Sequence, residues 1–192
     1  WRDVVVFVPR SSQGLGDFDG AFVVDSVYHM KTSGGKARHF FPELLAEIQA
    51  EFGVRMAAVC SGGACLESKG GSAASFGELL DRVPGSCRFV VPIICGNDWY
   101  DGFVRPLRGG VLDAARSFCA KLKQRSICSI SVVGMSSAVW GYDAWMAPLS
   151  ARRFDENGAA VADVFKSFGL SVRDGVAELE GVKLADRIGH VH

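Results

Sequence analysis

The sequence has no excess of charge of either sign, because 21 Lys and Arg residues are balanced by 21 Asp and Glu residues. A balanced chain is not drawn to nucleic acid or to an anionic membrane, so we expect neither as a direct partner. No apolar run approaches the roughly 18 residues of a membrane-spanning helix, so we expect no membrane span. With 192 residues, 48% of them hydrophobic, the chain excludes intrinsic disorder and predicts a single domain over residues 1–192.

Motifs that bind common cofactors are also missing. Gly14-Leu15-Gly16 and Gly70-Gly71 lack the spacing of a phosphate-binding loop. Cys60 and Cys65 have no histidine nearby and fit no zinc pattern. We therefore expect no organic cofactor and no metal ion.

Most of the six cysteines lie in apolar surroundings. Cys60, Cys95 and Cys128 lie in apolar stretches, and Cys119 lies beside Phe118 on an expected helix. Free cysteine in such places behaves as a small buried hydrophobe. We predict no more than one disulfide, which favours an intracellular, reducing compartment.

Short apolar runs separated by helical patterns define the expected fold. Four runs closed by Gly, Ser or Asp, and a shorter fifth one, predict strands over residues 21–25, 54–60, 88–95, 128–134 and 170–173. Apolar residues at helical spacing predict helices over residues 42–52, 76–83, 111–122 and 160–168. This alternation predicts a three-layer α/β/α sandwich on a five-stranded, mainly parallel, flavodoxin-like sheet. The expected strand order is second, first, third, fourth, fifth, with residues 1–17 as an N-terminal extension.

Polar residues close the predicted strands, at the sheet edge where such folds bind ligands. These closing residues are Asp25-Ser26 after the first strand, Ser61-Gly62-Gly63 after the second, Gly96-Asn97-Asp98 after the third, and Asp186 and His190 beyond the fifth. A hydroxyl, a glycine turn, a side-chain amide and a carboxylate with an imidazole are the components of acyl transfer.

The order of these blocks resembles that of the SGNH (GDSL-like) hydrolase family, from about Phe18 to the end of the chain. The resemblance implies an SGNH-type α/β/α sandwich and a serine esterase that needs no cofactor. Ser26 would be the nucleophile, His190 the base and Asp186 the acid that orients it. Gly62 and Asn97 would stabilise the oxyanion together with the N–H of Ser26.

Three positions depart from the family pattern. Val24 stands where the first block normally has glycine, and Gly96 directly precedes Asn97 where one residue normally intervenes. Asp186 and His190 are separated by one residue more than usual.

Several roles stay open at this point. Gly63 is the alternative to Gly62, and His192 is the alternative to His190. Another arrangement puts the last block at residues 174–177, where alanine would replace the base, but the five-strand count opposes it. We expect His29 on the helix or loop that leads away from Ser26, and His39 on the surface at the start of the first helix.

The loops after the third and fourth strands contribute two further expectations. Asp98 is expected to hold a loop rather than to touch substrate. Six aromatic residues follow these strands, and they either pack the loops over the core or form the wall of an apolar or acyl pocket; they are Trp99, Tyr100, Phe103, Trp140, Tyr142 and Trp145.

Two classes of function therefore compete. The first is a serine hydrolase acting on an acyl or acetyl ester. The second is a catalytically inactive domain of the same fold that serves as a binding or assembly module, and because the sequence begins with Trp1 we expect it to be part of a larger protein or complex. Flavodoxin-like cofactor binding ranks third, because the loop after the first strand lacks a phosphate-cradling run.

Overall fold

The structure is a computed structural model that describes most of the chain. The described residues are 4–9, 16–25, 29–31, 37–39, 41–67, 74–94, 96–100, 103–129, 132–133, 137, 146–173, 178–179, 182–183 and 188–189.

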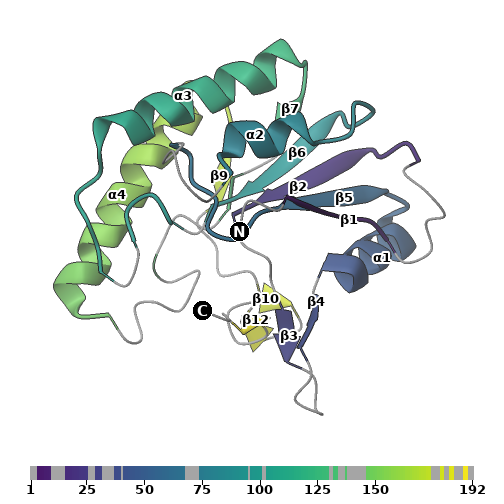
Figure 1. The fold of residues 1–192 in the computed structure, drawn as a ribbon, viewed down its shortest axis with the longest axis horizontal. Helices are drawn as coiled ribbons and strands as arrows, with labels where there is room; N and C mark the ends of the chain where they lie inside the picture. The colour runs from purple at the N-terminus through teal and green to yellow at the C-terminus, as the bar shows by residue number, and fades with distance from the viewer. Residues whose placement is uncertain are drawn as a thin grey trace.

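A mainly parallel sheet forms the centre of the molecule, with strand β2 (Gly20–Val24) in its middle (Figure 1). β2 pairs in parallel with β5 (Met56–Cys60) on one side and with β6 (Phe89–Ile93) on the other. β8 (Val132–Val133) and β9 (Val172–Arg173) continue the sheet beyond β6. The predicted α/β fold and strand order are therefore confirmed.

Helices cover both faces of this sheet (Figure 1). α1 (Phe41–Phe52) connects β2 to β5, whereas α2 (Phe76–Asp81) connects β5 back across β2 to β6. Because these crossovers run in opposite directions, right-handed connections place the two helices on opposite faces. α3 (Gly109–Gln124) and α4 (Pro148–Ser167) continue in the direction of α2 and lie on its face.

Aromatic side chains join the helices of the α2 face. The ring of Phe118 on α3 lies edge-on to Phe76 of α2 at 5.8 Å and to Phe165 of α4 at 6.1 Å between centroids. On the other face, Phe41 of α1 lies 6.0 Å from Phe22 of β2. Such ring pairs stabilise a core beyond the apolar area they bury, so they join the three helices of the α2 face to one another and α1 to the sheet.

Two details of the main sheet differ from the sequence prediction. The segment expected to be an extension contains β1 (Val5–Phe7), which pairs antiparallel with the outer edge of β5. The fourth strand consists of β7 (Cys128–Ser129), paired with the start of β6, and then β8. Ser129 and Val133 are four residues apart, whereas their partners Val90 and Ile93 are only three apart, and such an extra residue interrupts a ladder.

Two small sheets were not predicted at all. One joins β12 (Ile188–Gly189), β3 (His29–Lys31) and β4 (Ala37–His39), and the other joins β10 (Glu178–Leu179) and β11 (Val182–Lys183). The elements expected for His29 and His39 were therefore wrong, since both residues lie in strands and α1 begins only at Phe41. Two- and three-residue strands are too short to show a periodic pattern.

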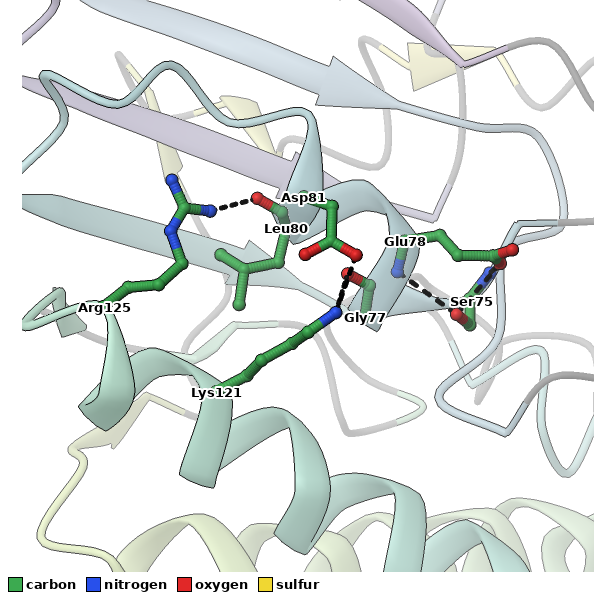
Figure 2. A network of polar contacts seen from close by, with 7 residues as sticks. All are labelled: Ser75, Gly77, Glu78, Leu80, Asp81, Lys121 and Arg125. Atoms are coloured by element: carbon green, nitrogen blue, oxygen red, sulfur yellow. Dashed lines mark hydrogen bonds and ion pairs between the residues drawn. The ribbon is translucent and has the colours of Figure 1, made fainter.

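Polar contacts attach the short helix α2 to α3 (Figure 2). The Ser75 side chain accepts the Glu78 N–H while Glu78 accepts the Ser75 N–H, which is a capping box. At the other end of α2, the Arg125 guanidinium donates to the carbonyls of Leu80 and Val83. The Leu80 carbonyl also accepts the backbone N–H groups of Arg82 and Val83, so Arg125 adds a further donor there and supplies a donor to Val83 O just past the helix.

No helix in the described part of the chain is both long enough and apolar enough to span a membrane.

Replacing Arg125 tests whether this contact holds α2 in place. Arg125→Met keeps the apolar stem but removes the donor to Val83 O and one of the donors to Leu80 O, so the free energy of unfolding should fall by about 1–3 kcal/mol. Urea denaturation measures the change. The control Arg116→Met removes only an exposed ion pair with Asp113 and should cost less than about 0.5 kcal/mol. Equal losses in both variants would contradict the role of Arg125.

Candidate functional site

The carboxyl ends of the three central strands meet at one backbone carbonyl, that of Asp25. This residue directly follows β2 and is 1% exposed. Its oxygen accepts the Gly63 N–H at 3.0 Å from the loop after β5. It also accepts Asn97 Nδ2 at 3.3 Å from the loop after β6. The residue before the predicted nucleophile is therefore attached to both neighbouring loops.

The glycine turn after β5 contains one backbone N–H, that of Gly62, that no described residue accepts. The Ser61 N–H donates to Val24 O at 3.2 Å, and the Ala64 N–H closes the turn onto Ser61 O at 3.2 Å. Gly63 needs its glycine, because its φ is +72°, and its N–H is bonded to Asp25. Gly62 is exposed, and no described residue accepts its N–H. Gly62 and Gly63 were the alternatives for the backbone oxyanion donor. Gly62 is thus the one whose N–H has no acceptor among the described residues and could bind an oxyanion.

Asn97 binds the ends of two other strands through its side chain. Its Nδ2 donates to Asp25 O and, at 3.1 Å, to Ala64 O. A side-chain amide nitrogen has two hydrogens, so these two bonds account for both. Asn97 is therefore placed at the predicted edge, but an oxyanion would have to replace one of these carbonyls to bind it.

The turn between β6 and Asn97 depends on Gly96. Its φ is +83°, and its carbonyl accepts the N–H groups of Trp99 and Tyr100 at 3.0 and 2.9 Å. A Cβ at this position would lie 2.6 Å from Cζ of Phe154 on α4. Only glycine combines this backbone conformation with such close packing.

Asp98 holds the loop after β5, as expected. Its carboxylate accepts the N–H of Leu66 at 2.7 Å and that of Glu67 at 3.1 Å.

The predicted nucleophile, base and orienting acid lie outside the described residues, and so does the alternative base; they are Ser26, His190, Asp186 and His192. In the sequence, Ser26 lies between β2 and β3, and His190 directly follows β12. The relevant described strands are therefore β3 and β12. They pair antiparallel, with Gly189 opposite His29, so the C-terminal segment returns beside the chain that follows β2.

The aromatic residues after β6 divide between core and surface. Trp99 is fully buried and lies 5.7 Å from the Phe154 ring, and Tyr100 lies 6.0 Å from the same ring. Phe103 is 60% exposed beneath the Arg105 guanidinium. Trp99 and Tyr100 therefore pack the loop onto α4, while Trp140, Tyr142 and Trp145 lie outside the described residues.

A groove along the start of α4 has no counterpart in the sequence pattern. Its lining includes Ser137 from the loop after β8, Met146, Arg152 and Asp155. The Asp155 carboxylate accepts the backbone N–H of Ser137 at 2.7 Å and its hydroxyl at 3.1 Å. No sequence pattern marks this contact, because it joins residues on separate elements.

Five described cysteines are free, namely Cys60, Cys65, Cys87, Cys119 and Cys128. Burial raises the pKa of the Cys60 thiol far above its usual range, and the nearby Asp25 charge raises it further. Burial likewise raises the pKa of Cys87 and of Cys119 to about 11. Cys128 was expected to be buried but is exposed, while Cys95 lies outside the described residues.

Among the described residues, no group of three or more His, Cys, Asp or Glu side chains could hold a metal ion.

The sequence matches no protein-family model and no curated protein. Solved structures resemble the chain in fold. One is a Lactobacillus plantarum protein, 14% identical, with a TM-score of 0.54 over 88% of this chain and 83% of that one. Another is a Corynascus carbohydrate esterase family 2 enzyme with a carbohydrate-binding domain, also 14% identical, with a TM-score of 0.58 over 84% of this chain and 57% of that one. The likeness establishes the fold.

Gly96→Ala tests the backbone turn at the end of β6. The substitution combines an unfavourable positive φ with a clash against Phe154, so we expect the free energy of unfolding to fall by more than about 2 kcal/mol. Gly53→Ala is the matched control, because Gly53 has a φ of +66° but open space around it. It should cost only about 1 kcal/mol in thermal or urea denaturation. Similar losses would contradict the close packing at Gly96.

Thiol labelling tests the burial of the cysteines. A thiol reagent at pH 8 should modify Cys128 in the folded protein long before Cys60, Cys87 or Cys119, because a buried thiol with a raised pKa supplies little thiolate. Peptide mass spectrometry identifies the labelled residues. Labelling in urea is the control, since all thiols should then react. Modification of Cys60 at the rate of Cys128 would contradict this picture.

Proposed function

We propose that the protein is a serine hydrolase that cleaves an ester through Ser26, His190 and Asp186. The observation that supports it most directly is the joined edge of β2, β5 and β6. There, Asp25, the residue before Ser26, is hydrogen-bonded to both neighbouring loops, and the Gly62 N–H is left without an acceptor among the described residues. Acyl transfer needs such a fixed, unengaged donor beside its nucleophile.

The pairing of β12 with β3 supports the choice of base. Gly189 lies opposite His29 in this pairing. His190 follows Gly189 directly, and Ser26 precedes His29 by three residues, which span at most about 11 Å. A base from the C-terminal segment is therefore within reach of a nucleophile after β2.

The proposed reaction has two steps. Ser26 Oγ attacks the ester carbonyl while His190 takes its proton and delivers it to the leaving alcohol. Water, activated by His190, then hydrolyses the acyl-enzyme and restores the serine. Asp186 holds the imidazole in the required tautomer, and the N–H groups of Ser26 and Gly62 stabilise the oxyanion. Asn97 would join them if its bond to Asp25, the longer of its two, were released.

An acyl or acetyl ester is the proposed substrate class. The structural likeness to a carbohydrate esterase makes carbohydrate esters the first natural candidates to test.

A non-catalytic binding or assembly module is the second candidate. The observation that favours it is the side chain of Asn97, which donates to two backbone carbonyls and so acts as a structural clamp. Val24 and the altered spacing around Asn97 and His190 agree with this alternative.

A fluorophosphonate probe and a p-nitrophenyl ester test the proposal. The wild-type chain should react with the probe and hydrolyse the ester, whereas Ser26→Ala should do neither. His190→Ala should be nearly as damaging, because the serine then lacks its base. Asn97→Ala should lower kcat by at most about 10²–10³-fold, since backbone donors remain.

Ser129→Ala is the matched control, because this buried serine lies in β7, away from the carboxyl edge. It should keep full activity. If His190→Ala retains activity while Ser26→Ala does not, the base is His192 or His29. A wild-type chain that neither hydrolyses esters nor reacts with the probe would support the binding module instead.

A further inference from the structure

The carboxylate of Asp98 connects the loop after β6 to the loop after β5. It is 5% exposed and accepts two backbone N–H groups, from Leu66 at 2.7 Å and from Glu67 at 3.1 Å. Hydrogen bonds to a charged acceptor are about twice as strong as neutral ones. This contact is therefore a strong anchor between the two loops.

The anchored segment contains the glycine turn. On its first side, the turn is held by the Gly63 N–H on Asp25 O. On its second side, Ala64 O accepts Asn97 Nδ2, and Cys65 is bonded to Ala74 O and to the Phe76 N–H. The two N–H groups that Asp98 binds follow directly. Within the turn itself, Gly62 and Gly63 are exposed, and a Cβ on either would meet nothing within 4 Å. The two glycines contribute no side-chain packing, so the turn is held by its backbone bonds and by the buried residues that follow it, Ala64, Cys65 and Leu66.

The side chain of Glu67 makes a second contact between the same two segments. Its carboxylate lies 2.6 Å from the guanidinium of Arg108, the residue before α3. Glu67 is thus bound through both its main chain and its side chain to the segment between β6 and α3.

We infer that Asp98 is a positioning residue that sets the direction of the Gly62 N–H at the carboxyl edge. The catalytic part of this inference rests on the proposed function, in which that N–H stabilises the oxyanion. An oxyanion donor acts only when it is aimed at the developing charge, and an error of about 1 Å can cost about 100-fold in rate. Asp98 touches no substrate in this scheme and acts through the backbone of Leu66 and Glu67.

Asp98→Asn removes one of the two hydrogen bonds that the side chain accepts, without changing the size of the side chain. Asparagine has one acceptor oxygen, so its NH₂ group must face one of the two backbone donors. The oxygen should keep the shorter bond to Leu66, which leaves the Glu67 N–H without an acceptor. The variant thus loosens the segment while keeping the side chain in place.

The experiment measures the loop and the reaction separately in the full chain. In Asp98→Asn, amide hydrogen exchange at Glu67 should become about tenfold faster, and the Gly62 amide resonance should shift. For p-nitrophenyl acetate, kcat should fall by about 10–100-fold while KM changes less than about twofold. A general loss of folded protein would lower the active fraction but could not move the Gly62 resonance of the folded molecules.

Asp155→Asn is the matched control, because Asp155 also accepts a backbone N–H, from Ser137. Its second partner is the Ser137 hydroxyl, which can rotate and accept from the new amide. This variant should leave kcat, the Gly62 resonance and exchange at Glu67 unchanged.

The outcomes separate this inference from the proposed function. Normal kcat in Asp98→Asn, in an active protein, overturns the inference, and so does an unmoved Gly62 resonance. If the wild-type chain hydrolyses no ester, the proposed function fails, and the Gly62 resonance alone decides whether Asp98 positions this N–H. An equal shift of the Gly62 resonance in the control Asp155→Asn also overturns the inference about Asp98.

Discussion

One backbone carbonyl, that of Asp25, joins the ends of the three central strands. It can do so because β2 lies between β5 and β6, with parallel register on both sides. The bond from Asn97 to this oxygen joins residues 72 positions apart in the chain. The Gly63 N–H, the Asn97 amide and the positive φ of Gly96 all depend on the strand order that brings these ends together.

The β5–α2–β6 connection is fixed at both of its ends. Near β5, the Asp98 carboxylate and the Asn97 amide hold the loop backbone. Beyond the loop, the Ser75 capping box starts α2, and Arg125 of the α3 end closes it. A six-residue helix is too short to be stable alone, so its position comes from these polar contacts and from its buried face. The exposed glycine turn is therefore held in place by these contacts on its flanking residues.

The strongly apolar strands and the amphipathic helices could be predicted because their signal is local. Residues 56–60 form a continuous apolar run, and Pro42 and Gly53 lie near the two ends of α1, as such residues do in helices. β1 was missed although Val4–Val8 is apolar, because nothing in the sequence indicates which strand it would pair with. The short strands around His29 and His39 form only by pairing with each other and with β12.

The sequence by itself determined where the main strands lie along the chain and which residues follow each of them. Local patterns suffice for this, since burial and periodicity are properties of neighbouring residues. The sequence therefore identified Gly62, Asn97 and Asp98 as residues at the carboxyl edge. Only the tertiary structure decided their roles. The Gly63 N–H is bonded to Asp25, while the Gly62 N–H has no acceptor in the described part of the chain. Asn97 donates to two carbonyls, and Asp98 binds the loop after β5. These are hydrogen bonds between distant segments, and their geometry follows from strand register and loop packing, which no local pattern records.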